Sequence, residues 1–330
     1  MKSVPTKKRW ARRTLLLLLM LLALCGLALV YLAYVYQPPE DRRELPTYKR
    51  QIHSQFVNAG PFRIHYLHVG QGAPVVLIPG GGTWIYELRT LTSALSSRSS
   101  VYALDPPGDG YTVALTAHPS YDLPTIDSTL LHFLDALHLF KVALIGHSFG
   151  GGYALSFTER YPSRVRQVIL LDSVGLNLPY VPFFEAMKWP LVGELTTKFI
   201  TPDLMRQQLQ TCLFSQQKIT TDMVQERYIP ATFRSNREAF YQLVRELDWK
   251  QTEQLLPQVR VPLLLIWGKQ DQLQPVDRLT RWHQLDPRAH IIVLDHAGHC
   301  VQEDQPQQVD QLVQDFLKGD REQALFTKPG

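Results

Sequence analysis

The sequence predicts an α/β fold in which helices cover both faces of a mostly parallel sheet. Between residues 51 and 318, short apolar runs rich in β-branched residues alternate with segments whose apolar residues recur at helical spacing. This alternation is typical of a parallel sheet, because its strands are joined by crossover helices. The alternation stops between residues 174 and 258, where prolines separate short helical patterns, and this region is predicted to be a helical insertion. A third feature is the uncharged run 14–36, which is long enough to be a transmembrane helix.

The N-terminal segment has the pattern of a signal-anchor helix. Residues 1–13 form a basic head without an acidic residue, and the apolar run 14–36 ends in a cluster of tyrosines. As a helix this run would span about 34 Å, enough for the hydrocarbon core of a bilayer. The positive-inside rule predicts that the head is cytoplasmic and that the chain after Tyr36 lies on the extracytoplasmic side.

Two other interpretations of this segment are disfavoured by its sequence. A signal peptide cleaved near residues 26–28 would give a secreted protein, but the apolar run is longer than the usual signal core. A lipoprotein site at Cys25 is disfavoured because the bulky Leu24 stands where a small residue is expected. The proline-rich, charged residues 37–50 predict an exposed linker, and residues 319–330 predict a polar tail.

The composition excludes several function classes. The formal charge is +4, but the basic head supplies the excess, and the rest of the chain is close to neutral. A nucleic-acid partner is therefore not expected. The three cysteines, Cys25, Cys212 and Cys300, form no disulfide framework and have no metal-ligand spacing, and the sequence leaves open whether the last two pair.

The folded part is predicted to run from residue 51 to 318, with the helical lid at about 174–258. A hairpin is expected around residues 58–61, between the first two strands. Strands are expected at 51–57, 62–69, 74–78, 101–104, 141–145, 168–171, 262–267 and 291–294, with helices at 84–97, 123–140, 151–160, 276–285 and 309–317.

The segment Gly146-His147-Ser148-Phe149-Gly150 lies between a predicted strand and a predicted helix. A G-x-S-x-G sequence in this context is the nucleophile elbow, a turn so tight that the residues two positions from the serine must be small. The turn exposes the Ser148 hydroxyl above the sheet. It also puts the Phe149 N–H at a helix start, where it can face a developing oxyanion.

A serine nucleophile needs a base, and the base needs an acid that orients it. Asp271 and His299 follow the serine in the order expected for an elbow, each a few residues beyond a predicted strand. His299 is preferred to His296 because a glycine before it lets the loop curl over the sheet, and Asp172 is a reserve acid. His147 is predicted to point away and to be structural.

The loop after the strand at 74–78 is rich in glycine, Gly80-Gly81-Gly82, and should supply the second oxyanion donor. We expect this donor to be the Gly81 N–H, acting together with the Phe149 N–H. The sequence contains no metal-ligand cluster and no phosphate-binding G-x-x-x-x-G-K, so no metal and no cofactor is predicted.

These motifs resemble the α/β-hydrolase superfamily over residues 51–318. The resemblance rests on the glycine loop, the elbow, Asp271 after Trp267-Gly268, and the turn at 105–110, together with Gly298-His299 followed by Glu303 and Pro306. The helical insertion after the sixth strand is similar to the lid of C–C bond hydrolases, haloperoxidase-like esterases, proline iminopeptidases and epoxide hydrolases. Two departures stand out: Pro79 replaces the family's usual histidine, and the serine nucleophile argues against epoxide hydrolase chemistry.

The sequence therefore predicts a membrane-anchored serine hydrolase that cleaves an ester or related acyl bond of a small, fairly apolar substrate. The expected site is Ser148, Asp271 and His299, with Gly81 and Phe149 as the oxyanion hole. Hydrolysis of a C–C bond or an amide on the same triad is the alternative within enzymes. A membrane-anchored relative that only binds a ligand or a partner protein is the alternative of another class.

Overall fold

The computed structural model describes residues 7–41 and 46–319, so the expectations for the start of the head, part of the linker and the end of the tail lie outside the described residues. The strands are β1 Gln55–Ala59, β2 Phe62–Val69, β3 Ala73–Ile78, β4 Ser99–Leu104, β5 Val113–Ala114, β6 Val142–His147, β7 Val165–Leu171, β8 Leu263–Gly268 and β9 His290–Leu294. The α-helices outside the insertion are α1 Lys7–Val30, α2 Thr47–Gln51, α3 Arg89–Ser96, α4 Leu123–Ala136, α5 Phe149–Arg160, α12 Leu279–Leu285, α13 Val301–Asp304 and α14 Pro306–Lys318.

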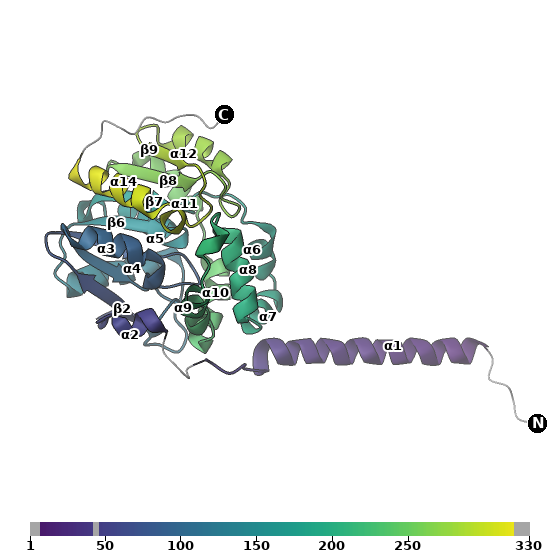
Figure 1. Cartoon of the computed structure of the whole chain (residues 1–330). Coiled ribbons are helices and arrows are strands. Elements are labelled where there is room, and N and C mark those ends of the chain that lie inside the picture. Colours follow the sequence, from purple (N-terminus) through teal and green to yellow (C-terminus); the bar gives the residue numbers. More distant parts are fainter. Residues whose placement is uncertain (1–6, 42–45, 320–330) are drawn as a thin grey trace, which may run out of the picture.

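The strands form one sheet in the order β1-β2-β4-β3-β6-β7-β8-β9, with the short β5 pairing with β2 (Figure 1). β2 is antiparallel to its neighbours β1, β4 and β5, and every other pair is parallel. The prediction of a mostly parallel sheet is confirmed. Because parallel strands end at the same edge, the loops after β3, β6, β7, β8 and β9 lie together there.

Both faces of the sheet are covered, and the period-2 pattern of each strand explains why. In β3, Val75 and Leu77 belong to the apolar core under α3 and α14, whereas Val76 and Ile78 belong to the core under α4, α5 and α12. A strand buried on both faces reads as a continuous apolar run, as β3 does. The predicted helices on both faces are confirmed.

The insertion between β7 and β8 contains α6 Pro182–Met187, α7 Val192–Lys198, α8 Pro202–Cys212, α9 Thr221–Ala231, α10 Arg234–Glu246 and α11 Lys250–Leu255. We call residues 174–258 the lid. These helices lie over the edge of the sheet at which the parallel strands end (Figure 1).

The predicted strand at 51–57 is wrong at its start. The helix α2 reaches Gln51, and β1 begins only at Gln55. Asn58 and Ala59 belong to the ladder with β2, so the hairpin turn is the dipeptide Gly60-Pro61. Gly60 has φ +59°, a conformation that glycine adopts without strain.

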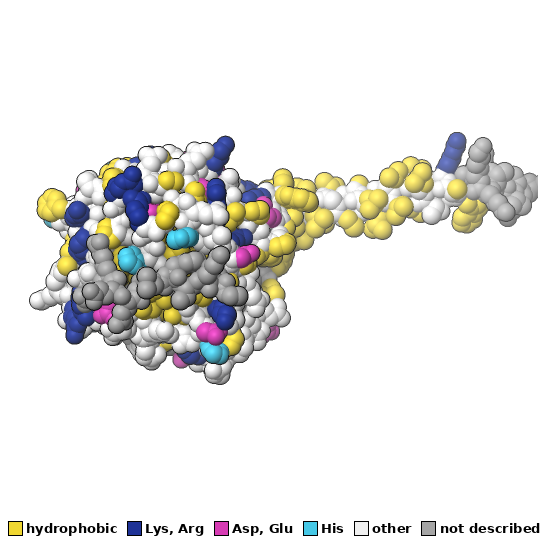
Figure 2. Space-filling model, turned by 90° about the horizontal axis from the view of Figure 1, so that it is seen from above, with side chains coloured by type: hydrophobic (Ala, Val, Ile, Leu, Met, Phe, Trp, Pro, Cys, Tyr) yellow, Lys and Arg dark blue, Asp and Glu magenta, His cyan; other side chains and the backbone are white. Residues whose placement is uncertain are grey.

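The N-terminal helix projects away from the body (Figures 1 and 2). α1 continues as a π-helical turn over Tyr31–Val35, and residues Trp10–Val35 form a helix long and apolar enough to cross a membrane. None of the most apolar part of this helix is buried in the protein. This finding fits a membrane anchor and fits a signal sequence equally, since both are apolar helices near the N-terminus.

The expectation of an exposed linker at 37–50 is only partly met: Pro39, Thr47 and Arg50 are exposed, whereas Pro46 is buried and the other described residues of this segment are half-buried. Thr232 accepts a hydrogen bond from the Asp41 N–H, and the Arg237 guanidinium donates to the carbonyl of Pro38. The Tyr48 N–H donates to Glu226 in α9. A polar composition does not by itself imply full exposure, because backbone groups of this segment are hydrogen-bonded to the lid.

Lys198, at the end of α7, holds the end of the N-terminal helix. Its ammonium lies 2.5 Å from the carbonyl oxygen of Ala33, 2.7 Å from that of Tyr36 and 3.2 Å from that of Leu32. The last carbonyls of a helix have no partner within it, so this charge satisfies groups that would otherwise need water. The N-terminal helix is therefore attached to the lid.

We expect Lys198→Met to loosen this attachment, because it removes a charged donor to three carbonyls. Trypsin should cut the full chain within residues 37–50 about tenfold faster. The reason is that lowering the free energy required for local opening by about 1.4 kcal/mol makes the open state about tenfold more populated. Lys188→Met, which removes a half-exposed lysine of the same lid, is the control. Equal cleavage rates in the two variants would show that Lys198 does not hold the segment.

Candidate active site

The elbow is built as the sequence predicts. β6 ends at His147, α5 begins at Phe149, and Ser148 between them has φ +49° and ψ −117°. A Cβ on Gly146 would lie 2.2 Å from the carbonyl oxygen of Gly150, and one on Gly150 would lie 2.3 Å from that of Ile78. Since these neighbours are backbone atoms, only glycine fits, and the close approach forces Ser148 into its strained conformation.

Three side chains predicted from the sequence meet at the edge of the sheet. His299 Nε2 lies 3.0 Å from Ser148 Oγ, and His299 Nδ1 lies 2.8 Å from Asp271 Oδ2. Asp271 also accepts hydrogen bonds from the backbone N–H groups of Leu273 and Gln274, each at 2.8 Å, which fix its carboxylate. The three catalytic candidates are each less than a tenth exposed.

This geometry sets the direction in which a proton can move. The Asp271 carboxylate holds the proton of the neutral imidazole on Nδ1, so the lone pair of Nε2 faces the Ser148 hydroxyl. Burial alone lowers the pKa of His299, but the neighbouring Asp271 carboxylate outweighs it and raises this pKa to about 9. Asp271 therefore both orients the ring and stabilises its charged form.

The alternatives considered from the sequence take other places. The Asp172 carboxylate accepts hydrogen bonds from the backbone N–H groups of Gly268 and Val301, so it supports the loops on either side of the site. His296 lies outside the cluster, with its ring against Phe214. The preference for Asp271 over Asp172 and for His299 over His296 agrees with these positions.

Gly81 and Phe149, the expected oxyanion donors, both line the cavity above Ser148. The N–H groups on either side of Gly81 are engaged: that of Gly80 donates to Glu87 at 2.7 Å and that of Gly82 to Asp109 at 2.8 Å. Two carboxylates thus fix the loop. A Cβ on Gly81 would lie 2.4 Å from the Phe149 ring, so glycine is needed there too.

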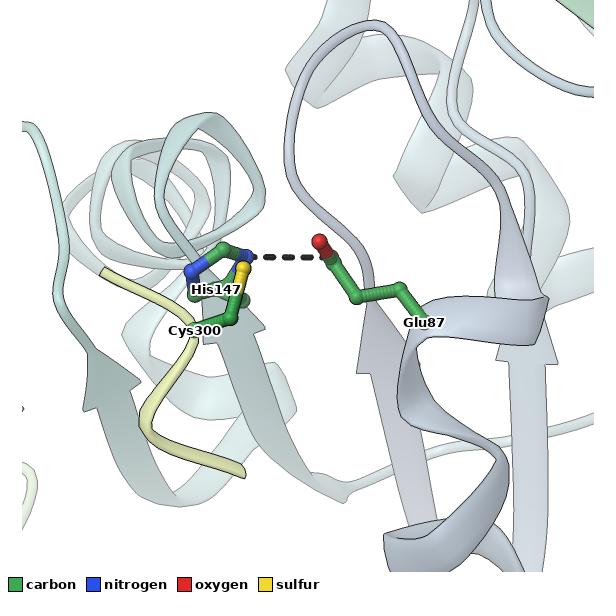
Figure 3. Close-up of side chains that lie close together, drawn as sticks. All are labelled: Glu87, His147 and Cys300. Atoms are coloured by element: carbon green, nitrogen blue, oxygen red, sulfur yellow. Dashed lines mark hydrogen bonds and ion pairs between the residues drawn. The ribbon is translucent and has the colours of Figure 1, made fainter. Parts of the chain in front are cut away.

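Beside this loop lies a buried cluster of Glu87, His147 and Cys300 (Figure 3). His147 Nδ1 lies 3.0 Å from Glu87 Oε2, and its Nε2 lies 2.7 Å from the carbonyl oxygen of His299. Both ring nitrogens therefore have oxygen atoms as partners. The expectation that His147 points away from the site is wrong: its ring lines the cavity, lies 4.9 Å from the His299 ring between centroids, and holds the backbone of His299.

The cluster contains residue types that bind metals, with its ligand atoms within 4.8 Å of one another. However, the two nitrogens of His147 already have partners, and the Cys300 thiol hydrogen-bonds with Cys212. The Arg227 guanidinium on Glu87 adds a positive charge. These contacts favour a structural ionic network over a cation site. Cys212 and Cys300 are both free thiols in this structure.

Arg227 of α9 connects this network to the lid. Its guanidinium contacts Glu87 at 3.1 Å and also forms an ion pair with Glu303, and all three side chains are almost fully buried. Burial raises the pKa of Glu87, but the charges of His147 and Arg227 outweigh this effect and hold that pKa well below its usual range. Glu87 therefore joins the glycine loop to the lid and, through His147, to the backbone of His299.

Sequence reasoning missed Glu87, Arg227 and Lys198. Glu87 lies in an otherwise apolar run from Trp84 to Leu88, and a lone acid at such a position is the signal that was available. Its partner Arg227 is 140 residues away in the sequence, so nothing local pointed to the pair.

A narrow cavity of about 60 Å³ opens onto Ser148. Its floor is the glycine loop, Ser148 and His299, and its roof is mostly apolar. The lid and the loop after β8 supply the apolar lining: Val174, Tyr180, Val181, Phe184, Met205, Leu209, Cys212, Phe240 and Leu273. A cavity of this size holds a few water molecules, so a substrate larger than that requires the lid to move.

The chain has clear relatives of known type. A model of the alpha/beta hydrolase family matches residues 75–312. The 2-hydroxy-6-oxo-2,4-heptadienoate hydrolase of Pseudomonas putida is 29% identical over 275 residues, which cover 80% of this chain and 95% of that protein.

Among solved structures, a bacterial membrane phospholipase A is 25% identical with a TM-score of 0.72, covering 94% of this chain and 99% of that one. The meta-cleavage product hydrolase of Pseudomonas fluorescens has the same TM-score at 24% identity and covers 81% of this chain and 98% of that one. At this identity the second likeness supports the fold alone.

We expect Arg227→Met to lower the free energy of unfolding by about 3–5 kcal/mol, because it leaves Glu87 and Glu303 buried without their cation. Urea unfolding of the full chain in detergent micelles measures the change. Arg234→Met removes a largely exposed pair with Glu238 from the same lid and should cost no more than about 0.5 kcal/mol. A loss as small as that of the control would contradict a buried ionic network.

The pKa of His299 predicts how the reactivity of Ser148 depends on pH. The imidazole acts as a base only when neutral, so the rate of reaction with a fluorophosphonate should rise with pH and reach half its maximum near pH 9. Asp271→Asn removes the charge that raises this pKa. We expect the midpoint to move to lower pH and the maximum rate to fall about 10²–10⁴-fold.

The matched control is Asp295→Asn, which changes an exposed aspartate in the loop before His299. It should leave the midpoint in place. An unchanged midpoint in Asp271→Asn would mean that Asp271 does not act on His299.

Proposed function

Because the chain belongs to the alpha/beta hydrolase family, we propose that it is a membrane-anchored serine hydrolase that cleaves carboxylic-ester bonds through an acyl-enzyme. The observation that carries the proposal is the hydrogen-bonded series Asp271–His299–Ser148 beneath an apolar lid. The apolar helix that precedes the domain in the sequence is the proposed anchor. The basic head would lie in the cytoplasm and the catalytic domain on the extracytoplasmic side of the membrane.

The proposed reaction follows from the geometry. Ser148 Oγ attacks the ester carbonyl while His299 Nε2 takes its proton, and the charged ring is stabilised by Asp271. The N–H groups of Gly81 and Phe149 stabilise the oxyanion of the tetrahedral intermediate. His299 then gives the proton to the leaving alcohol. A water molecule next attacks the acyl-enzyme while His299 takes its proton, and the acid is released when His299 returns this proton to Ser148.

An acyl lipid or a similar amphiphilic ester is the proposed substrate class. The roof of the cavity is mostly apolar, with Gln208 and Arg227 as the polar lid side chains, whereas the floor is formed by Ser148, His299 and the glycine loop. Similarity to a membrane phospholipase A over 94% of this chain supports the choice, since that match extends beyond the catalytic domain.

Hydrolysis of a C–C bond in a dienoate acid is the second candidate, supported by the 29% identity to a heptadienoate hydrolase. Such a substrate carries a carboxylate that needs a cation. Arg227 is the cationic side chain among the described residues lining the cavity, and its charge is already balanced by Glu87 and Glu303. This balance favours an uncharged acyl group in the cavity.

Labelling with a fluorophosphonate tests the proposal directly. We expect the full chain in detergent to be labelled, and Ser148→Ala and His299→Ala to lose labelling by at least about 10³-fold. Turnover of p-nitrophenyl butyrate but not of a dienoate acid would favour the ester hydrolase over the C–C hydrolase. Folded wild-type protein that takes no label would contradict the proposal and favour the ligand-binding alternative.

A further inference from the structure

The outer face of the lid is apolar and lies on the side from which the N-terminal helix leaves the body. Phe183 in α6, Trp189 after it, Phe199 after α7 and Leu204 in α8 are all between 47% and 69% exposed. We call these four residues the lid face. Figure 2 shows apolar side chains gathered on the body around the base of the helix. Large apolar side chains that gather on one side of a protein surface mark an interaction site, although charged residues such as Lys188 and Asp203 lie on or next to the same helices.

The C-terminal end of the N-terminal helix indicates where the membrane surface would lie relative to the lid. Tyr31, Tyr34 and Tyr36 would lie among the lipid headgroups if α1 crosses a bilayer, since tyrosines concentrate at that level. Phe199 stacks on Tyr36 with ring centroids 6.3 Å apart, and Lys198 binds the last carbonyls of the helix. The end of α7 is therefore at headgroup level, and α6, which carries Phe183, packs against α7 (Figure 1).

The helices of the lid face are also the wall of the cavity. In α6, Phe183 points outward, whereas the next residue, Phe184, lines the cavity. In α8, Leu204 is exposed, whereas Met205 and Leu209 line the cavity. The helices α6 and α8 thus form a single layer between the cavity at Ser148 and the lid face, with apolar side chains on both surfaces of that layer.

We propose that the lid face rests in the headgroup and upper acyl region of the same bilayer that holds α1, and that acyl esters reach Ser148 from this bilayer between α6 and α8. The inference rests on the proposed ester hydrolase and adds where its substrate comes from. Aromatic rings are suited to the membrane interface. The attachment by Lys198 keeps the lid face at the membrane surface without a second anchor.

Trp189 is a built-in probe for this contact. Of the six tryptophans, Trp10 lies in the N-terminal helix, and Trp84, Trp249, Trp267 and Trp282 are at most 4% exposed. The full chain with Trp10→Phe is reconstituted in phosphatidylcholine vesicles with and without bromine on the acyl chains. We expect bromine to quench Trp189, and the quenching to disappear when Trp189→Phe is added.

Absence of quenching would overturn the docking proposal. If the lid face contacts a second copy of the chain instead, Trp189 would stay unquenched and its emission would change with the protein-to-lipid ratio, which would also overturn the proposal.

A second measurement separates docking from catalysis. Phe183→Ser with Leu204→Ser should lower hydrolysis of a vesicle-borne phosphatidylcholine ester at least about tenfold, because burial of these side chains in lipid is lost. Hydrolysis of soluble p-nitrophenyl butyrate should stay within twofold. Phe140→Ser, at an 81% exposed aromatic residue before β6 and so at the opposite edge of the sheet, is the control and should change neither rate.

An equal fall on both substrates, or no fall on either, would overturn the proposal. Failure of the wild-type protein to hydrolyse the soluble ester would contradict the proposed function alone, since Trp189 quenching does not depend on turnover.

Discussion

The close approach of the Ser148 turn to β3 is the constraint on which the site depends. Gly146 faces the backbone of Gly150, and Gly150 faces the backbone of Ile78, so neither position has room for a side chain. This packing forces the serine into a positive φ and presents its hydroxyl above the sheet. It also brings the glycine loop after β3 beside the start of α5, and the oxyanion donors of the proposed mechanism come from these two elements. The catalytic geometry is thus a consequence of how two strands and one helix pack.

Around this turn, a buried ionic network joins parts of the chain that are far apart in sequence. Glu87 accepts the N–H of Gly80 and contacts both His147 and the lid residue Arg227, while His147 donates to the carbonyl of His299. Such pairs add little net stability compared with apolar packing, but losing one partner leaves an uncompensated buried charge. The network therefore fixes the lid, the glycine loop and the backbone of His299 in one arrangement, and a movement of the lid would have to break or rearrange these contacts.

The parts of this picture that the sequence predicted are the parts with local signals. The elbow is a strand–turn–helix whose two glycines lie only four residues apart in the chain, and Asp271 and His299 follow strands in the expected order. Glu87, Arg227 and Lys198 were not predicted, because their partners lie in elements that only the tertiary structure brings together. The linker was expected to be exposed because its composition is polar, yet composition does not reveal that Thr232, Arg237 and Glu226 meet its backbone. The start of β1 was misplaced because the pattern at 51–57 does not mark where α2 ends.

The proposed mechanism requires that the acyl group of the substrate becomes covalently bonded to Ser148 during turnover. Intact-mass and peptide analysis of the full chain, stopped with acid during turnover of p-nitrophenyl butyrate, would test it most directly. We expect the protein to gain the mass of one butyryl group, located on the peptide that contains Ser148. Steady release of p-nitrophenol without an acyl group on Ser148, or with the group on another residue, would contradict it.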